Sequence, residues 1–380
     1  MASKCGIYIH IPFCKSKCFY CDFYSTVNTK YKQDYVNAVL SELKIRKNFL
    51  QCKQIESIYL GGGTPSILSV EEIEKIILAI CNNFEIQKGA EITIEVNPDD
   101  ITPEYAKSLF DIGINRISIG TQSFDDKALK FLGRRHNSKR NLQAIDYLLS
   151  AGFNNISIDL IYGLPLQDIN YLQKSLNTIK TLHINHISAY HLTIEDGTVF
   201  GKLQQKGKKL IIDDDRSQEE YFFVINTLKE IGFEHYEISN FARNKQYSAH
   251  NSGYWFGMEY LGLGPSAHSY NSKIRCWNTS NLYHYLNKLK QGKTPCYGNE
   301  NITKNTAYND YIITRMRTSK GINTKEIESQ FGSKYLKIAK KAVAKYSQNP
   351  EILLINNNNI ILTDKGLFLS DSIMQDFIIV

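Results

Sequence analysis

The sequence predicts an α/β fold, and three observations support the prediction. Short strand-like runs alternate with helix-length segments over the first 191 residues, which is typical of parallel strands joined by crossover helices. Within these runs apolar and polar residues alternate, so the two faces of the sheet differ. The rhythm changes after residue 235 and again near residue 300. We therefore expect a partial (β/α)6 barrel followed by a C-terminal α+β, winged-helix-like domain.

The six expected strands have helices with clear boundaries between them. Ser69 and Glu72 form a capping box, and Thr102-Pro103 supplies an N-cap followed by proline at the first helical position. Glycines at 113, 152 and 232 follow helix ends. The predicted strands are 7–11, 57–60, 91–97, 116–120, 156–161 and 187–191.

The alternation inside the strands indicates a hollow barrel. Isoleucine and valine in 91–97 alternate with Glu91, Thr93, Glu95 and Asn97, and the isoleucines of 156–161 oppose Ser157 and Asp159. A closed eight-stranded barrel is filled by branched aliphatic side chains, and a doubly wound sheet is apolar on both faces. We expect the apolar face to take the helices and the polar face to line an interior that holds a polar ligand.

The remainder of the chain divides into two further parts. The stretch 236–300 is rich in aromatic residues and glycine and is expected to form irregular strands and loops over the open side. From residue 301 the pattern predicts helices near 305–317, 323–331 and 334–347, then a hairpin made by 352–355 and 360–363. The expected units are therefore 1–235, 236–300 and 301–380.

Composition narrows the class of protein. At 42% hydrophobic the chain buries a substantial core, and its net charge of +7 is modest and favours an anionic ligand. We expect no membrane span, no secretion leader and a cytoplasmic location. Residues 320–345 hold seven lysines and two glutamates, which leaves a nucleic-acid-binding winged helix as a weak alternative.

Three of the eight cysteines stand close together directly after the first strand. Cys14, Cys18 and Cys21 form C-x-x-x-C-x-x-C, one ligand short of a structural zinc site or a four-cysteine electron-transfer cluster. Three thiolates on a [4Fe-4S] cluster leave one iron open, and this pattern is typical of enzymes that bind S-adenosylmethionine at that iron. The alternatives are core cysteines or a zinc knuckle that includes His10. Small hydrophobic roles are expected for Cys5, Cys52, Cys81, Cys276 and Cys296.

Polar residues near the ends of other strands predict the rest of a cofactor site. The turn Gly61-Gly62-Gly63-Thr64-Pro65 offers backbone groups at close approach and is expected to hold the methionine amino group. Asp159 is suited to ribose hydroxyls and Arg134 to the methionine carboxylate. Glu95 and Gln122 lie on the same face, which also carries Tyr8 and His10. Taken singly, each polar residue is better explained as a solvated or internally paired group, and His10 is equally well explained as a packed histidine. Their presence together on one face predicts a site.

The segment His250-Asn251-x-x-Tyr254-Trp255 is a second cluster. A loop histidine beside large aromatic rings is a candidate haem ligand. The alternative is a hydrogen-bonded histidine in a small aromatic core.

Several stretches resemble one family closely. They include GIYIHIPFCKSKCFYCDF, GGGTPS, ISIGTQSF, DLIYGLP, AYHLTIEDGT, EISNFA and HNSGYW with YLGLGPSAHS. The chain resembles the radical S-adenosylmethionine (SAM) family of oxygen-independent coproporphyrinogen III oxidases, and within it the haem chaperone branch named HemW. The motifs run from residue 6 to about residue 280. The resemblance implies a TIM-type radical SAM barrel, cluster ligation by Cys14, Cys18 and Cys21, and haem as a further ligand at His250. It also implies SAM contacts from Tyr8, Tyr20, Gly62, Gly63, Thr64, Glu95, Gln122, Arg134, Asp159 and Ala189.

The departures from the oxidases decide between two functions. The oxidases carry a further cysteine two places after the triplet, where this chain has Phe23, and a longer segment before the first strand. The resemblance therefore favours a haem chaperone that passes haem to an acceptor protein. The alternative is oxidative decarboxylation of coproporphyrinogen to protoporphyrinogen by a deoxyadenosyl radical. Either function implies a reductant such as a flavodoxin or ferredoxin, and neither needs nucleic acid.

Overall fold

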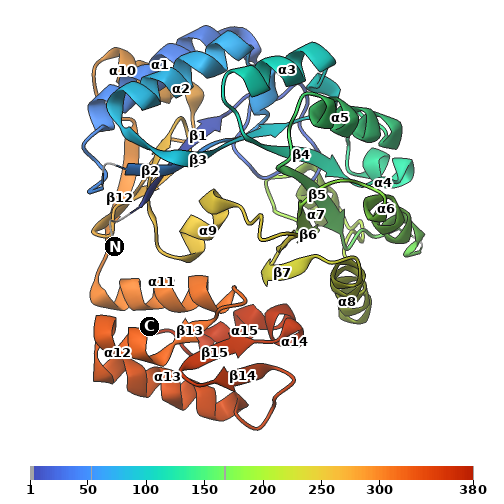
Figure 1. The fold of residues 1–380 in the computed structure, drawn as a ribbon, viewed down its shortest axis with the longest axis vertical. Helices are drawn as coiled ribbons and strands as arrows, with labels where there is room; N and C mark the ends of the chain where they lie inside the picture. Colours follow the sequence, from blue (N-terminus) through green and yellow to red (C-terminus); the bar gives the residue numbers. More distant parts are fainter. Residues whose placement is uncertain (1–3, 53, 167, 380) are drawn as a thin grey trace.

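The computed structural model describes residues 4–52, 54–166 and 168–379, and it confirms the predicted fold class. Six parallel strands lie in the order β1-β2-β3-β4-β5-β6, and helices cover one side of the curved sheet (Figure 1). The strands of this barrel are Cys5–Ile11, Gln54–Gly62, Glu85–Val96, Arg116–Gln122, Ile156–Tyr162 and His186–His191. The helices that join them are α1 (Lys32–Arg46), α2 (Val70–Asn83), α3 (Pro103–Asp111), α4 (Asp126–Phe131), α5 (Ser138–Ser150) and α6 (Asn170–Lys180).

The helix boundaries follow the predicted chemistry. The Ser69 side chain accepts a hydrogen bond from the Glu72 amide while Glu72 reaches back to the Ser69 amide, and the Thr102 hydroxyl caps α3. Gly113 and Gly152 have positive φ just after helix ends, where a side chain would be strained. These caps place each crossover so that the next strand enters parallel to the previous one.

The two faces of the barrel strands differ as the alternation predicts. Ile7, Ile9 and Ile11 of β1 pack in the core beneath the helices, together with the isoleucines of β3, β4 and β5. The opposite face buries polar side chains, among them Ser57, Thr93, Arg116, Ser118, Ser157 and His186. The interior of the barrel is therefore polar, and its polar groups must find partners in each other, in water or in a ligand.

The segment 236–300, expected to form irregular strands and loops, contains short strands that continue the large sheet. Strand β9 (Glu259–Leu263) pairs in parallel with β1, and β10 to β12 continue the sheet, while β7 and β8 extend it beyond β6. The pattern is obscured because these strands are short and because Gly262 interrupts β9, where the His268 carbonyl leaves no room for a side chain. The remaining elements up to residue 301 are α7 (Val199–Gln205), α8 (Asp214–Glu230), β7 (Glu234–Glu237), β8 (Asn240–Ala242), α9 (Ala249–Trp255), β10 (His268–Tyr270), β11 (Ile274–Asn278), α10 (Leu282–Lys290) and β12 (Cys296–Asn301).

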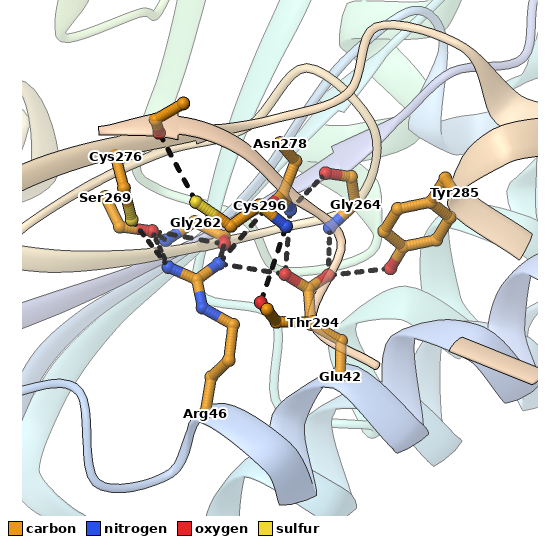
Figure 2. A network of polar contacts seen from close by, with 11 residues as sticks. Glu42, Arg46, Gly262, Gly264, Ser269, Cys276, Asn278, Tyr285, Thr294 and Cys296 are labelled. Carbon is orange, nitrogen blue, oxygen red and sulfur yellow. Dashed lines mark hydrogen bonds and ion pairs between the residues drawn. The ribbon is translucent and has the colours of Figure 1, made fainter. Parts of the chain in front are cut away.

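A buried polar network ties these added strands to α1 (Figure 2). The Arg46 guanidinium pairs with Glu42 at 2.9 Å and donates to the Gly262 carbonyl and the Ser269 hydroxyl. Glu42 in turn accepts from Asn278 and Tyr285. Because every charged group in the network has partners, its burial is tolerated, whereas removal of one partner would leave a buried charge alone.

The last eighty residues form a second core around a three-stranded sheet of order β13-β15-β14. As predicted, three helices precede a hairpin, and the helical run 305–317 corresponds to α11. This unit lies against α8, β7 and α9, where Ile238 N donates to Arg317 O and the Tyr221 hydroxyl to Asp364 O (Figure 1). Its elements are α11 (Lys304–Met316), β13 (Ile322–Asn323), α12 (Thr324–Phe331), α13 (Ser333–Tyr346), β14 (Leu353–Asn356), β15 (Asn359–Leu362), α14 (Asp364–Phe368) and α15 (Ser370–Gln375).

Two further observations concern the chain as a whole. Cys5 and Cys52, both expected to be plain small hydrophobes, lie side by side with Cα atoms 6.4 Å apart, a separation that a disulfide can span. Cys5 begins β1 and Cys52 comes just before β2, and the pairing of these strands brings the two together. In the described part of the chain, no helix is both long and apolar enough to cross a membrane.

Candidate functional site

The three-cysteine loop begins directly at the C-terminal end of β1. Hydrogen bonds from Cys14 N to Thr26 O and from Thr26 N to Pro12 O fold the loop back against its own start. Cys14 is buried, and Cys18 and Cys21 are half-buried. Burial raises the pKa of the Cys14 thiol, and it raises the pKa of Cys21 to about 11. The positive charge of a bound metal group would favour the thiolate forms, which are the forms that ligate.

Hydrogen-bond donors lie beside two of the three thiols, and hydrogen bonds to sulfur are one means by which a protein tunes an iron–sulfur cluster. Arg134 donates to Cys18 Sγ at 3.2 Å and Thr64 to Cys14 Sγ at 3.4 Å, which are hydrogen bonds suited to cluster sulfur ligands.

The glycine turn after β2 lies against this loop. Gly63 N donates to Ile11 O and Thr64 N to Phe13 O, each at 2.8 Å. A Cβ on Gly63 would stand 2.7 Å from Phe13 O and 3.1 Å from Cys14 Sγ, and one on Gly62 would meet the His10 ring at 2.6 Å. Gly62 also has a φ of 108°. Glycine is thus required at both positions, and the turn leaves open backbone beside the thiols.

Two half-buried carboxylates lie on the inner face beneath the turn. Glu95 accepts from the Tyr59 hydroxyl at 2.8 Å and from Gly62 N at 3.1 Å, and burial raises its pKa to about 7. Burial also raises the pKa of Asp159 to about 6, against the opposing effect of Arg134. Each carboxylate therefore gains from a ligand that brings positive charge or hydroxyl donors.

Arg134 reaches this site from the segment after α4. One of its terminal nitrogens donates to Gly120 O at 2.8 Å, and its buried Nε has no partner among the described residues. Gln122, at the end of β4, has a φ of 63°, a conformation that costs energy for a residue with a side chain. A buried guanidinium nitrogen without a partner is the feature expected where an anionic group of a ligand belongs.

Two tyrosines complete the predicted set on this side. The electrostatic neighbours of the Tyr20 phenol are Arg134, Cys18, Cys21 and Asp159, so it lies between the cysteine loop and the interior. The Tyr8 hydroxyl shares a hydrogen bond with His10 Nδ1 at 3.1 Å. The Tyr8 ring stacks against the Tyr59 ring, with centroids 6.1 Å apart.

His250 lies apart from the cysteine loop, and in a helix rather than the expected loop. It is in α9, against the N-terminal halves of β1 and β2, on the side of the sheet opposite to α1 and α2 (Figure 1). Its Nδ1 is 2.8 Å from Ser57 Oγ and its Nε2 is 2.9 Å from Tyr254 OH, and only 1% of it is exposed. Burial lowers its pKa to about 3. Both ring nitrogens are engaged, so iron ligation would require one of these bonds to break.

The side chain of Ala189 does not point into the barrel interior, and the sequence did not predict two residues that do. The Ala189 side chain packs in the core beneath the helices, and its amide donates to Ser239 O, because Ser188 and Tyr190 are the residues of β6 that alternate inward. The missed residues are Tyr59, which holds Glu95, and Arg116, whose buried Nε is 3.8 Å from Glu91. Both lie at inward positions of strands that the alternation had already identified.

Comparisons with known proteins agree with this geometry. A family model described as the Radical SAM superfamily matches residues 8–179, and one described as the HemN C-terminal domain matches 302–369. The fold is similar to that of coproporphyrinogen III oxidase (HemN) from Escherichia coli, with a TM-score of 0.85 and 23% identity over 99% of this chain and 90% of that one. The cysteine loop, the barrel and these matches define a radical SAM protein, a class that implies a [4Fe-4S] cluster and SAM.

Full-length relatives define the family more narrowly. The chain is 32% identical to the heme chaperone HemW of Lactococcus lactis over 98% of this chain and 97% of that protein. It is 31% identical to the heme chaperone HemW of Bacillus subtilis over 98% of both. The chain belongs to the HemW family.

Proposed function

We propose that this protein is a haem chaperone that carries a [4Fe-4S] cluster with SAM, binds haem and transfers it to an acceptor protein. The full-length similarity to heme chaperones HemW is the observation that carries the proposal. Phe23, in place of the further cysteine of the oxidases, supports it over porphyrinogen decarboxylation. We also propose a cytoplasmic location and a reductant such as a flavodoxin or ferredoxin.

The proposed cofactor site combines the cysteine loop with the inner residues around it. Cys14, Cys18 and Cys21 would hold the cluster, which when bound supplies an open iron and an electron. Gly62, Gly63 and Thr64 form the turn beside the loop: a Cβ on Gly63 would stand 3.1 Å from Cys14 Sγ, and the Thr64 hydroxyl donates to the same sulfur at 3.4 Å. Arg134 offers an unpartnered buried Nε to a carboxylate, and Asp159 and Glu95 offer acceptors to hydroxyl and ammonium groups. Tyr8, Tyr20 and Gln122 bound the same space.

The proposed domains keep the boundaries expected from the sequence, but the middle segment takes a different structural role. Residues 1–235 form the proposed cofactor barrel and 301–380 the winged-helix-like unit. The segment 236–300 is part of the large sheet through β9 to β12, so we propose that it extends the barrel wall instead of covering its open side. The inward position of α9 makes His250 part of the barrel floor.

Anaerobic reconstitution tests the function. The full chain, supplied with iron and sulfide, should gain cluster absorbance, bind ferric haem and pass it to an apo-haemoprotein, and it should leave coproporphyrinogen unchanged. A Cys18→Ser variant should lose the cluster, whereas Cys81→Ser, which changes an exposed cysteine of α2, should keep it. Formation of protoporphyrinogen, or failure of the wild-type chain to bind haem, would contradict the proposal.

A further inference from the structure

The nine histidines of the chain differ sharply in whether their ring nitrogens are available. Hydrogen bonds engage both nitrogens in one group: His10, His186, His191, His235 and His250. His136 is buried and uses one nitrogen on Thr121 O. Within the described residues, the rings of His183, His268 and His284 make no hydrogen bond. Haem iron needs an unengaged imidazole nitrogen, so these three are the candidates.

Of the three, His268 lines a cavity. The cavity measures about 420 Å³, and its walls include His268, Trp277, Tyr297, Ser266, Thr279 and Ser280. That volume lies within the range of small-molecule sites, which is roughly 300–1,000 Å³. Tyr297 is 76% exposed at the rim, which is high for so large an aromatic side chain. The walls thus combine aromatic surface, three hydroxyl groups and one unengaged imidazole.

The cavity lies on the continuation of the inner face of the barrel. The register places Tyr8 beside Gly262, and His268 beside Trp277, which faces Gly298 on β12. The neighbouring residues Ser269 and Cys276 point the other way, to Arg46 on α1 (Figure 2). His268 and Trp277 therefore belong to the face of the sheet that does not carry α1.

Trp277 fixes the orientation of the imidazole. The two rings stack with centroids 6.0 Å apart and planes inclined by 27°. The indole is itself held against Gly298, where a Cβ would stand 2.6 Å from the ring. Stacking through the ring faces leaves the nitrogens at the imidazole edge accessible. Partial burial lowers the pKa of His268, and Arg275 adds to the effect, which favours the neutral imidazole that ligates iron.

Hydrogen bonds link the chain that forms the cavity to the segment that follows the cysteine loop. The cavity wall begins at Ser266, just after β9, which ends at the same edge of the sheet as β1. Ser280, on the opposite wall, lies two residues before Leu282, whose amide donates to the Tyr24 hydroxyl at 2.6 Å. Tyr24 O is in turn 2.8 Å from His10 Nε2. The cavity is therefore connected through Leu282 and Tyr24 to the segment that follows the cysteine loop.

We propose that haem binds in this cavity with His268 as an axial ligand of the iron. Trp277 acts as a positioning residue, because its stacked indole would hold the His268 imidazole in the orientation that presents a ring nitrogen to the iron. Ser266, Thr279 and Ser280 supply hydroxyl donors for the propionates. The inference rests on the proposed chaperone function and names the site that this function requires.

The test is a titration of the full chain with ferric haem and, separately, with iron-free protoporphyrin IX. His268→Ala should weaken haem binding by about tenfold or more and abolish the spectrum of imidazole-ligated iron, while protoporphyrin binding stays within about twofold. Added imidazole should restore the ligation spectrum. His284→Ala, at an exposed histidine of α10, is the matched control and should bind like wild type.

The outcomes separate this inference from the function on which it rests. If wild type binds haem and His268→Ala keeps the same affinity and spectrum, the assignment of His268 is overturned and the chaperone function stands. If wild type binds no haem, both are overturned. Trp277→Phe should retain ligation with a changed spectrum, whereas unchanged spectra in both variants would place haem elsewhere.

Discussion

The barrel has a mouth at the C-terminal ends of its strands and a floor at their N-terminal ends. Both ends bury similar polar side chains, but the hydrogen bonding of these side chains differs. At the floor, His250 has partners on both nitrogens, and Glu91 accepts from Ala249 N and His250 N at 2.8 and 3.1 Å. At the mouth, Arg134 Nε has no partner among the described residues, and burial raises the pKa of Glu95 to about 7. In the described part of the chain, unpartnered polar atoms also occur away from the mouth, at Arg116 Nε and Thr93 Oγ1, so such an atom indicates a ligand site where, as at Arg134, the same side chain also contacts the cysteine loop.

The largest expected effect is at the mouth. Replacement of Cys14, Cys18 and Cys21 by alanine together should reduce cluster iron from about four atoms per chain to near zero, because no other thiol in the loop can replace them. The melting temperature of the cluster-free chain should remain close to that of cluster-free wild type. Iron analysis and thermal unfolding measure the two. A variant that unfolds would show that the thiols are structural.

At the floor, replacement of a buried side chain by alanine should lower the stability of the fold. His250→Ala leaves a cavity and removes a partner from Ser57 and from Tyr254, so we expect a loss of about 2–4 kcal/mol in the free energy of unfolding. Denaturant unfolding of the full chain measures it. The folded-state pKa of about 3 lies below the unfolded value of 6.5, so wild type should lose stability as pH falls from 6.5 towards 3. The variant should lack this part of the pH dependence.

Glu95 should differ from His250 both in how its replacement changes stability and in how its ionisation makes stability depend on pH. Its folded-state pKa of about 7 lies above the ordinary 4.5, so the folded chain binds more protons and loses stability as pH rises from 4.5 through 7. Glu95→Gln should therefore stabilise the ligand-free chain at pH 8 by roughly 2–3 kcal/mol while weakening SAM binding. Unfolding curves at pH 5 and pH 8 test this. Equal effects at both pH values would mean that Glu95 is already ionised at pH 5.

The smallest effect is expected from Ser57→Ala, again at the floor. It removes one hydrogen bond to His250 Nδ1 without opening a large cavity, so a loss of about 1 kcal/mol is expected. Because Ser57 and His250 share the bond, the double variant should lose less than the sum of the single losses. A double-variant cycle by denaturant unfolding measures this coupling, and strict additivity would contradict it.

The sequence predicted the barrel well because its strands are regular. Period-two alternation located six strands and identified the inward position of Glu95, Asp159 and Tyr8, and the capping residues located the helix ends. The alternation did not reveal β9, because Gly262 interrupts the apolar pattern there. Glycine is needed at this position because the His268 carbonyl of β10 leaves no room for a side chain. The proximity of Cys5 to Cys52 and the partners of His250 were equally hidden, because they depend on contacts between residues 47 and 193 positions apart.

The position of β1 within the sheet has a consequence for the order of folding. It lies between β2 and β9, so one edge of the strand that leads to the cysteine loop stays open until residue 263 has been synthesised. Arg46 likewise waits for Gly262 and Ser269, more than two hundred positions later. Contacts so distant in sequence form slowly, and an open strand edge invites pairing with other chains. The nascent chain thus passes through a stage in which its future cofactor strand is vulnerable to aggregation.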